Sequence, residues 1–268
     1  MTLRYEKDGA VATFAFDNGR MNIFTPQFHK ALFEALSDFV ADSAIRVGIM
    51  GGAPGRSFSA GDDIKTPLPA LSPAETLEAH LFPHAHEGEK GLTRPGWEQD
   101  VMRLRRYKPI VGAVDGYCLG QGLIYLLLLT DIRLATPRAE FGFPEIAYGM
   151  GGAGGTARLG LQIPHVVAME MLLVGERIGA ERALAANLVN RIVPEDRLAA
   201  EARAIADRIA AHPPVAVRVE MESYARAMEM TREQAMDYVG TLFRLQRLGY
   251  PGDGAQGGAP FKKEAAAK

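Results

Sequence analysis

The order of strand-like and helix-like segments constrains the fold of this chain more than any other feature. Residues 3–16 predict two strands joined at Asp8-Gly9, a dipeptide that tolerates the positive φ of a tight hairpin. Further short apolar runs of strand character are separated by segments with apolar residues at helical spacing. These runs are residues 46–50, 110–116 and 131–136. Such β-α-β order predicts an α/β fold.

Local start signals predict where several helices begin. Thr25 has the character of an N-cap, with Pro26 at the first helical position and apolar residues recurring behind it. Residues 72–75, Ser-Pro-Ala-Glu, have the spacing of a capping box. Further helices are expected at residues 96–107 and 122–129.

After Pro164 the pattern becomes mostly helical. Apolar residues recur at helical spacing over residues 199–211, 215–228 and 231–248, and Pro213-Pro214 breaks the series. We therefore expect a core over residues 1–200, a helical C-terminal region over 201–250 and a flexible tail over 251–268.

Composition excludes several classes of function. A chain of 268 residues that is 47% hydrophobic can bury a large core, and its net charge of -2 provides no general attraction for nucleic acid or anionic membranes. The single cysteine, Cys118, excludes an internal disulfide and suits a reducing compartment. The longest apolar run, LIYLLLL, is too short to span a bilayer. We expect a cytoplasmic protein with neither a nucleic-acid nor a membrane partner.

Small residues follow two of the predicted strands and leave backbone amides at the strand ends. Ser59, Ala60 and Gly61 form one such turn, and Gly120 lies in another, directly before an apolar helix. Two amides converging on one point can hold an oxyanion, and Glu145, ahead of a glycine-rich stretch with almost no other charge, could supply a base. The alternative is that these glycines serve turn geometry alone.

Two other motifs are weaker indications of function. Residues 149–154 match the G-x-G-x-x-G pattern of dinucleotide sites, but Pro144 precedes them and no acidic residue closes a βαβ unit. His80, His84 and His86 suggest a metal site, yet no carboxylate is spaced to complete it. We expect solvated or structural histidines and no metal.

Four blocks carry a resemblance to a known family. They are FSAGDDI (58–64), KPIVGAVDGYCLGQG (108–122), AEFGFPEIAYGMGGAGGTARL (139–159) and LLVGERIGAERALAANLVNRIVP (172–194). In this order and spacing they resemble the enoyl-CoA hydratase/isomerase, or crotonase, superfamily. The resemblance implies a crotonase-like core of repeated β-β-α units, a helical C-terminal region and assembly into homotrimers or hexamers. It also implies binding of acyl-CoA thioesters, with coenzyme A as part of the substrate and no separate cofactor.

The resemblance also implies roles for individual residues. The backbone N–H groups of Ala60 and Gln121 are expected to hold the thioester oxygen, and Glu145 is expected to be the catalytic base. Gln121 stands where the family usually has glycine, and the glycine-rich stretch after Gly149 is one residue shorter than usual. The expected substrate-binding residues are Ser59, Gly61, Asp62, Ile64, Gly120, Ile124 and Tyr148. Asp63 and Asp131 are expected to be structural.

Position 124 bears on the reaction. Family hydratases usually carry a second glutamate there, and Ile124 removes a partner for water and dries the pocket. A single carboxylate suffices to shift a double bond, so the sequence favours an enoyl-CoA isomerase, and a drier site should raise the pKa of Glu145. The alternatives are a hydratase or lyase with an unusual second polar group, and an acyl-CoA binder without catalysis. Thioester hydrolysis or decarboxylation would need a nearby histidine or tyrosine.

Overall fold

Two sheets organise the part of the chain that the computed structural model describes, residues 3–66, 71–81, 96–151 and 159–249. The larger sheet has six strands in the order β1-β2-β3-β4-β6-β9, and a smaller sheet has the order β5-β7-β8. The strands of the larger sheet are β1 (Leu3–Asp8), β2 (Val11–Phe16), β3 (Val47–Gly52), β4 (Ile110–Val114), β6 (Ile132–Ala135) and β9 (Arg191–Ile192). Those of the smaller sheet are β5 (Tyr117–Leu119), β7 (Glu140–Gly142) and β8 (Ile178–Gly179). The expected α/β class is confirmed.

The predicted hairpin forms as expected. Strands β1 and β2 pair antiparallel with Asp8 opposite Val11, and Gly9 has a φ of 59°. The remaining neighbours in the larger sheet pair parallel. The other predicted strands correspond to β3, β4 and β6, with bounds that differ by a few residues.

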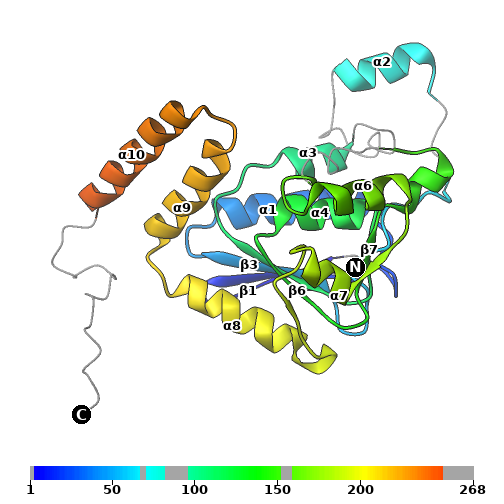
Figure 1. Ribbon diagram of the computed structural model, residues 1–268, viewed down its shortest axis with the longest axis horizontal. Helices are drawn as coiled ribbons and strands as arrows, with labels where there is room; N and C mark the ends of the chain where they lie inside the picture. The colour runs from blue at the N-terminus through cyan, green and yellow to red at the C-terminus, as the bar shows by residue number, and fades with distance from the viewer. Residues whose placement is uncertain (1–2, 67–70, 82–95, 152–158, 250–268) are drawn as a thin grey trace.

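Helices cover both faces of the larger sheet (Figure 1). The helices are α1 (Pro26–Ala41), α2 (Pro73–Leu81), α3 (Trp97–Arg103), α4 (Gln121–Leu129), α6 (His165–Leu173), α7 (Ala180–Ala185), α8 (Leu198–Ala210), α9 (Pro214–Ala227) and α10 (Arg232–Gly249), with 3₁₀ turns η2 (Pro144–Tyr148) and η3 (Glu195–Arg197). In Figure 1, α1 and α4 lie on one side of the sheet and α8 on the other. Helices α9 and α10 pack against each other and extend away from the sheets.

Two of the predicted helix starts are confirmed by their caps. The Thr25 hydroxyl oxygen accepts a hydrogen bond from Phe28 N at 3.3 Å, with Pro26 at the first helical position. Ser72 and Glu75 form the reciprocal bonds of a capping box. The helix expected at residues 96–107 is shorter and ends at Arg103.

The core lies between the sheet and the α1–α4 layer. Phe16, Phe24, Phe28 and Phe58 are fully buried, or nearly so, and their rings form edge and stacked pairs. A second cluster joins α8 to the opposite face of the sheet. Helix α8 therefore packs as part of the core, although the helical C-terminal region was expected to begin at residue 201, inside this helix. The expected tail over 251–268 lies outside the described residues.

Candidate active site

The first turn of the candidate site, residues 59–62, is fixed by hydrogen bonds within the turn and to the segment around residue 22. Ser59 is fully buried, and its hydroxyl donates to Asn22 O at 2.7 Å and accepts from Gly61 N at 3.0 Å. The amide of Ala60 donates to Met21 O at 2.8 Å. The structure therefore does not support Ala60 as an oxyanion donor, because its N–H is engaged in a backbone hydrogen bond.

The amide of Asp62, two residues after Ala60, has a different direction. Phe24 N donates to Gly61 O at 2.8 Å, and Asp63 N donates to Phe24 O at 2.9 Å, which makes a parallel bridge between Phe24 and Asp62. In this pairing the N–H of the bridged residue points away from its partner strand. The amide of Asp62 is thus directed toward the side of the turn where Gln121 lies.

The second turn leads into α4. Gly120 caps this helix with a φ of 53°, and Gln121 is its first residue. The amide N of Gln121 lies 3.6 Å from the point where a side chain on Gly61 would begin. The first N–H groups of a helix have no partner inside the helix and carry its positive dipole. Segments 59–62 and 120–121 therefore lie side by side, with the amide of Gln121 close to the turn that carries Asp62.

The Gln121 side chain is buried as well. It is 6% exposed, and its amide nitrogen Nε2 has no hydrogen-bond partner among the described residues. The family glycine expected at this position is thus replaced by a side chain that fits inside the protein, and the backbone N–H keeps its place at the start of α4.

Glu145 lies directly beside this second turn. It belongs to η2, which Pro144 begins and Gly149 ends with a φ of 73°. A side chain on Gly120 would overlap the Glu145 carboxylate oxygen Oε1, and its first carbon would be 3.2 Å from Cδ. Residues 25 positions apart in the sequence therefore place a carboxylate against the cap of α4.

The other predicted site residues differ in their exposure. Ile124 is 2% exposed on α4, so hydrocarbon occupies the position of the usual second glutamate. Ile64 and Tyr148 are largely exposed. Asp63 accepts from the amides of Lys65 and Thr66, which gives it the structural role that was expected.

Other expectations concern residues away from this turn. Asp131 pairs with Arg106 at 2.7 Å and accepts from Ile110 N, consistent with a structural role. His84 and His86, and the side chain of His80, lie outside the described residues. Within the described ranges, no group of three or more His, Cys, Asp or Glu could hold a metal ion.

Tyr125, His29 and Asp62 form a group of polar side chains that was not predicted from the sequence. The Tyr125 hydroxyl lies 2.7 Å from His29 Nδ1, and His29 Nε2 lies 3.3 Å from Asp62 Oδ1. Two sequence signals could have indicated it: a histidine on the apolar face of the helix at 26–41, and a tyrosine within a run of leucines.

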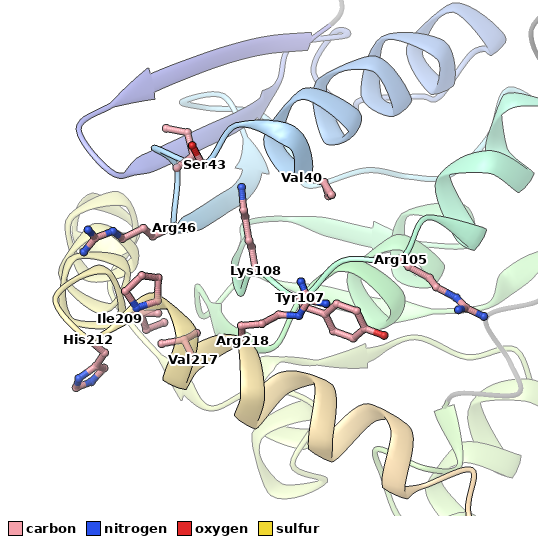
Figure 2. Close-up of a pocket in the computed structure, with 12 residues that line it drawn as sticks. Val40, Ser43, Arg46, Arg105, Tyr107, Lys108, Ile209, His212, Val217 and Arg218 are labelled. Carbon is pink, nitrogen blue, oxygen red and sulfur yellow. The ribbon is translucent and has the colours of Figure 1, made fainter. Parts of the chain in front are cut away.

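A separate basic cavity lies elsewhere on the molecule (Figure 2). It has a volume of about 360 Å³ and is lined by residues of α1, α9 and the segment before β4, including Lys108 and Arg218. The Lys108 ammonium donates to Phe39 O and Asp42 O, and burial lowers its pKa. The Arg218 guanidinium lies 4.1 Å from the centre of the Tyr107 ring. Neither Gln121 nor Glu145 lines this cavity.

The fold and the order of its turns define a crotonase-type α/β protein. The chain belongs to the enoyl-CoA hydratase/isomerase family, whose sequence model matches residues 6–246. It is 33% identical over 228 residues to (E)-benzylidenesuccinyl-CoA hydratase of Thauera aromatica, covering 85% of this chain and 83% of the relative. It is 30% identical over 266 residues to carnitinyl-CoA dehydratase of Escherichia coli K12, covering 98% and 96%.

Solved structures agree with the family assignment. An enoyl-CoA hydratase subunit I from Geobacillus kaustophilus superposes with a TM-score of 0.79 at 28% identity, over 92% of this chain and 90% of that one. An enoyl-CoA hydratase/isomerase from Mycobacterium paratuberculosis gives 0.74 at 26% identity, again over 92% and 90%. The protein is therefore an acyl-CoA enzyme of the crotonase family. In the described residues, no helix combines the length and apolar character needed to cross a membrane.

Proposed function

We propose that this enzyme adds water to, or removes it from, an acyl-CoA thioester by way of an enolate. The contact between Glu145 and Gly120 carries the proposal, because it sets a carboxylate beside the amide at the start of α4. In this arrangement the amides of Asp62 and Gln121 hold the thioester oxygen, in place of the expected pair Ala60 and Gln121. Glu145 then moves a proton to or from the adjacent carbon.

Stabilisation of the enolate depends on where its negative charge develops. Moving a proton from the α-carbon transfers negative charge to the thioester oxygen, and one well-placed donor contributes about 3 kcal/mol to its stabilisation. A base positioned for proton transfer typically contributes a further factor of about 10²–10⁴ in rate. The amides act on the thioester oxygen and Glu145 acts on the adjacent α-carbon, so both are needed for any reaction that passes through this enolate.

The names of the relatives favour addition or removal of water over double-bond migration. The names of the two curated relatives describe a hydratase and a dehydratase acting on CoA thioesters. Asp62, with its carboxylate beside the first turn, offers a second polar group of the kind that water chemistry needs.

Double-bond migration, the reaction that the sequence favoured, is the second candidate. The buried Ile124 supports it, because a site with one carboxylate can take a proton from one carbon and return it at another without water. Glu145 also argues against a binder without catalysis, which would have no need of a carboxylate at that place.

The test compares wild-type protein with Glu145→Gln on 2-enoyl-, 3-enoyl- and 3-hydroxyacyl-CoA thioesters in deuterated water, followed by mass spectrometry and NMR. We expect water addition with deuterium at the α-carbon, and a loss of about 10²-fold or more in Glu145→Gln. Glu140→Gln is the matched control, since this surface carboxylate pairs only loosely with Arg177 at 3.2 Å. Double-bond migration alone would favour the second candidate, and binding without any reaction or exchange would contradict both.

We also propose assembly into homotrimers or hexamers. Helices α9 and α10 support it, because they extend from the core and expose large apolar side chains. These include Tyr224, Met228, Met236, Phe243 and Leu248. Monomeric proteins rarely expose large contiguous apolar patches, so contact between copies would cover these side chains.

A further inference from the structure

A buried chain of three polar side chains lies behind the first turn of the site. Tyr125 is fully buried on α4, His29 is 5% exposed on α1, and the Asp62 side chain is 16% exposed. The chain therefore leads from the interior outward and ends in a carboxylate at the turn. A polar group buried this deeply needs a partner: the Tyr125 hydroxyl and His29 Nδ1 form a hydrogen bond, and His29 Nε2 approaches Asp62 Oδ1 to 3.3 Å.

The chemistry of the three groups fixes the direction of the chain. A carboxylate only accepts, so the proton of a neutral His29 is favoured on Nε2, which faces Asp62 Oδ1 at 3.3 Å. Nδ1 is then an acceptor, and the Tyr125 hydroxyl at 2.7 Å donates to it. His29 is enclosed by the rings of Phe24 and Tyr125, whose centres lie 5.8 and 5.7 Å away. In such apolar surroundings each polar contact is stronger than in water.

Asp62 and Glu145 are carried by the two segments that meet at the site. Asp62 follows Gly61, whose Cα faces the amide of Gln121, and Glu145 lies against Gly120. Helix α4 has Ile124 where a second carboxylate would be expected, and its next residue, Tyr125, supports His29 instead. The carboxylate missing from α4 thus has a counterpart on the opposite segment.

We propose that Asp62 is a second catalytic carboxylate and that His29 and Tyr125 are positioning residues for it; this rests on the proposed function. In water addition, the Asp62 carboxylate accepts one proton of a water molecule while the water oxygen bonds to the β-carbon of a 2-enoyl thioester. The electrons of the double bond move onto the thioester oxygen as the enolate forms. Protonated Glu145 then donates its proton to the α-carbon. Asp62 is left neutral and Glu145 ionised, and a proton passes between them through solvent before the next turnover; dehydration is the reverse.

The experiment separates this role from that of Glu145. Two rates are measured on each full-length variant: formation of 3-hydroxyacyl-CoA from 2-enoyl-CoA, and exchange of the α-proton of a saturated acyl-CoA with deuterated water. The second rate needs the enolate and a base, but no attack by water. The variants are Asp62→Asn, which keeps the backbone amide, and Tyr125→Phe, which removes one oxygen from a buried site. Asp63→Asn is the control, being the same change one residue further along.

We expect Asp62→Asn to lower water addition about 10²-fold or more and to leave exchange within about 3-fold of wild type. Tyr125→Phe should lower kcat for water addition about 5-fold at unchanged KM, again without changing exchange. Asp63→Asn should change neither the rate of water addition nor the rate of exchange. A merely structural role would lower both rates together, so parallel loss in Asp62→Asn, or retained water addition, would overturn the proposal for Asp62. So would a wild-type enzyme that adds no water. Exchange that persists in Glu145→Gln would instead contradict the proposed function.

Discussion

The Glu145 carboxylate occupies the space that a side chain at Gly120 would fill. Gly120 also has a φ of 53°, which L side chains rarely adopt, and its amide donates to Gly142 O at 3.0 Å. Three features therefore constrain Gly120, the residue that caps α4: its positive φ, the hydrogen bond of its amide and the contact with Glu145. Its lack of a side chain is what allows the carboxylate of η2 to lie beside the start of the helix.

Replacing Gly120 with alanine should move this carboxylate. A displacement of about 1 Å at a reacting group can lower the rate about 10²-fold, and we expect that loss in α-proton exchange by Gly120→Ala. Gly9→Ala is a matched control, because Gly9 has a φ of 59° but no heavy atom within 4 Å of an added methyl group. Both variants should lose about 1–2 kcal/mol of stability from the unfavourable φ, measured by urea unfolding. Equal exchange rates in the two variants would contradict the inferred role of Gly120 in leaving space for the Glu145 carboxylate.

Elements with local signals could be predicted from the sequence. The hairpin at Asp8-Gly9 and the caps at Thr25 and Ser72 depend on residues adjacent in the chain, so their residue types suffice. The helix predicted to reach residue 107 ends at Arg103 instead. The segment beyond it runs to β4, where Lys108 donates to carbonyls at the end of α1, a contact that no local pattern contains.

The site itself depends on pairing between distant segments. Residue types at 58–62 do not reveal which amide faces the site, because that is decided by the backbone partners Met21 and Phe24. The family resemblance therefore implied Ala60 as a donor, although its amide is engaged with Met21 O. The group formed by His29, Asp62 and Tyr125 was missed for the same reason, since its members are up to 96 positions apart.

Asp115 should make stability depend on pH. Burial opposes its ionisation, but hydrogen bonds from Arg138 and Thr136 outweigh this effect and lower the pKa of the carboxyl group. Because the folded pKa lies below the unfolded one, the stabilisation is complete above the unfolded value of about 3.9 and is lost as pH falls through the folded value.

We therefore expect Asp115→Asn to lower the free energy of unfolding at pH 7 by about 1–3 kcal/mol, with a smaller difference from wild type at acidic pH. Denaturant titrations at several pH values measure this. Asp8→Asn removes a largely exposed carboxylate that pairs with Arg203, and it should change stability by less than about 0.5 kcal/mol. A difference for Asp115→Asn that stays constant with pH would contradict the assigned cause.

The exposed apolar residues of α10 should contribute to assembly. Met236 and Phe243 are seven residues apart, so they share one face of the helix. In size-exclusion chromatography with light scattering, we expect wild-type protein at the mass of three or six chains. The double variant Met236→Glu and Phe243→Glu should shift toward smaller species, whereas Arg232→Glu, an added acidic group at the start of α10, should not. A monomeric wild-type protein would rule out the proposed assembly.

The amide of Gln121 can be removed without breaking α4. Gln121 is the first residue of the helix, where proline is well tolerated because no N–H is needed inside the helix. Gln121→Pro should therefore leave the fold intact but remove one donor from the thioester oxygen, lowering enolate formation by about 10²–10³-fold. Gln121→Ala keeps the amide, so it should retain α-proton exchange within about 3-fold of wild type. If both variants lose exchange equally, the Gln121 side chain rather than its backbone amide holds the oxygen; if neither does, the oxyanion lies elsewhere.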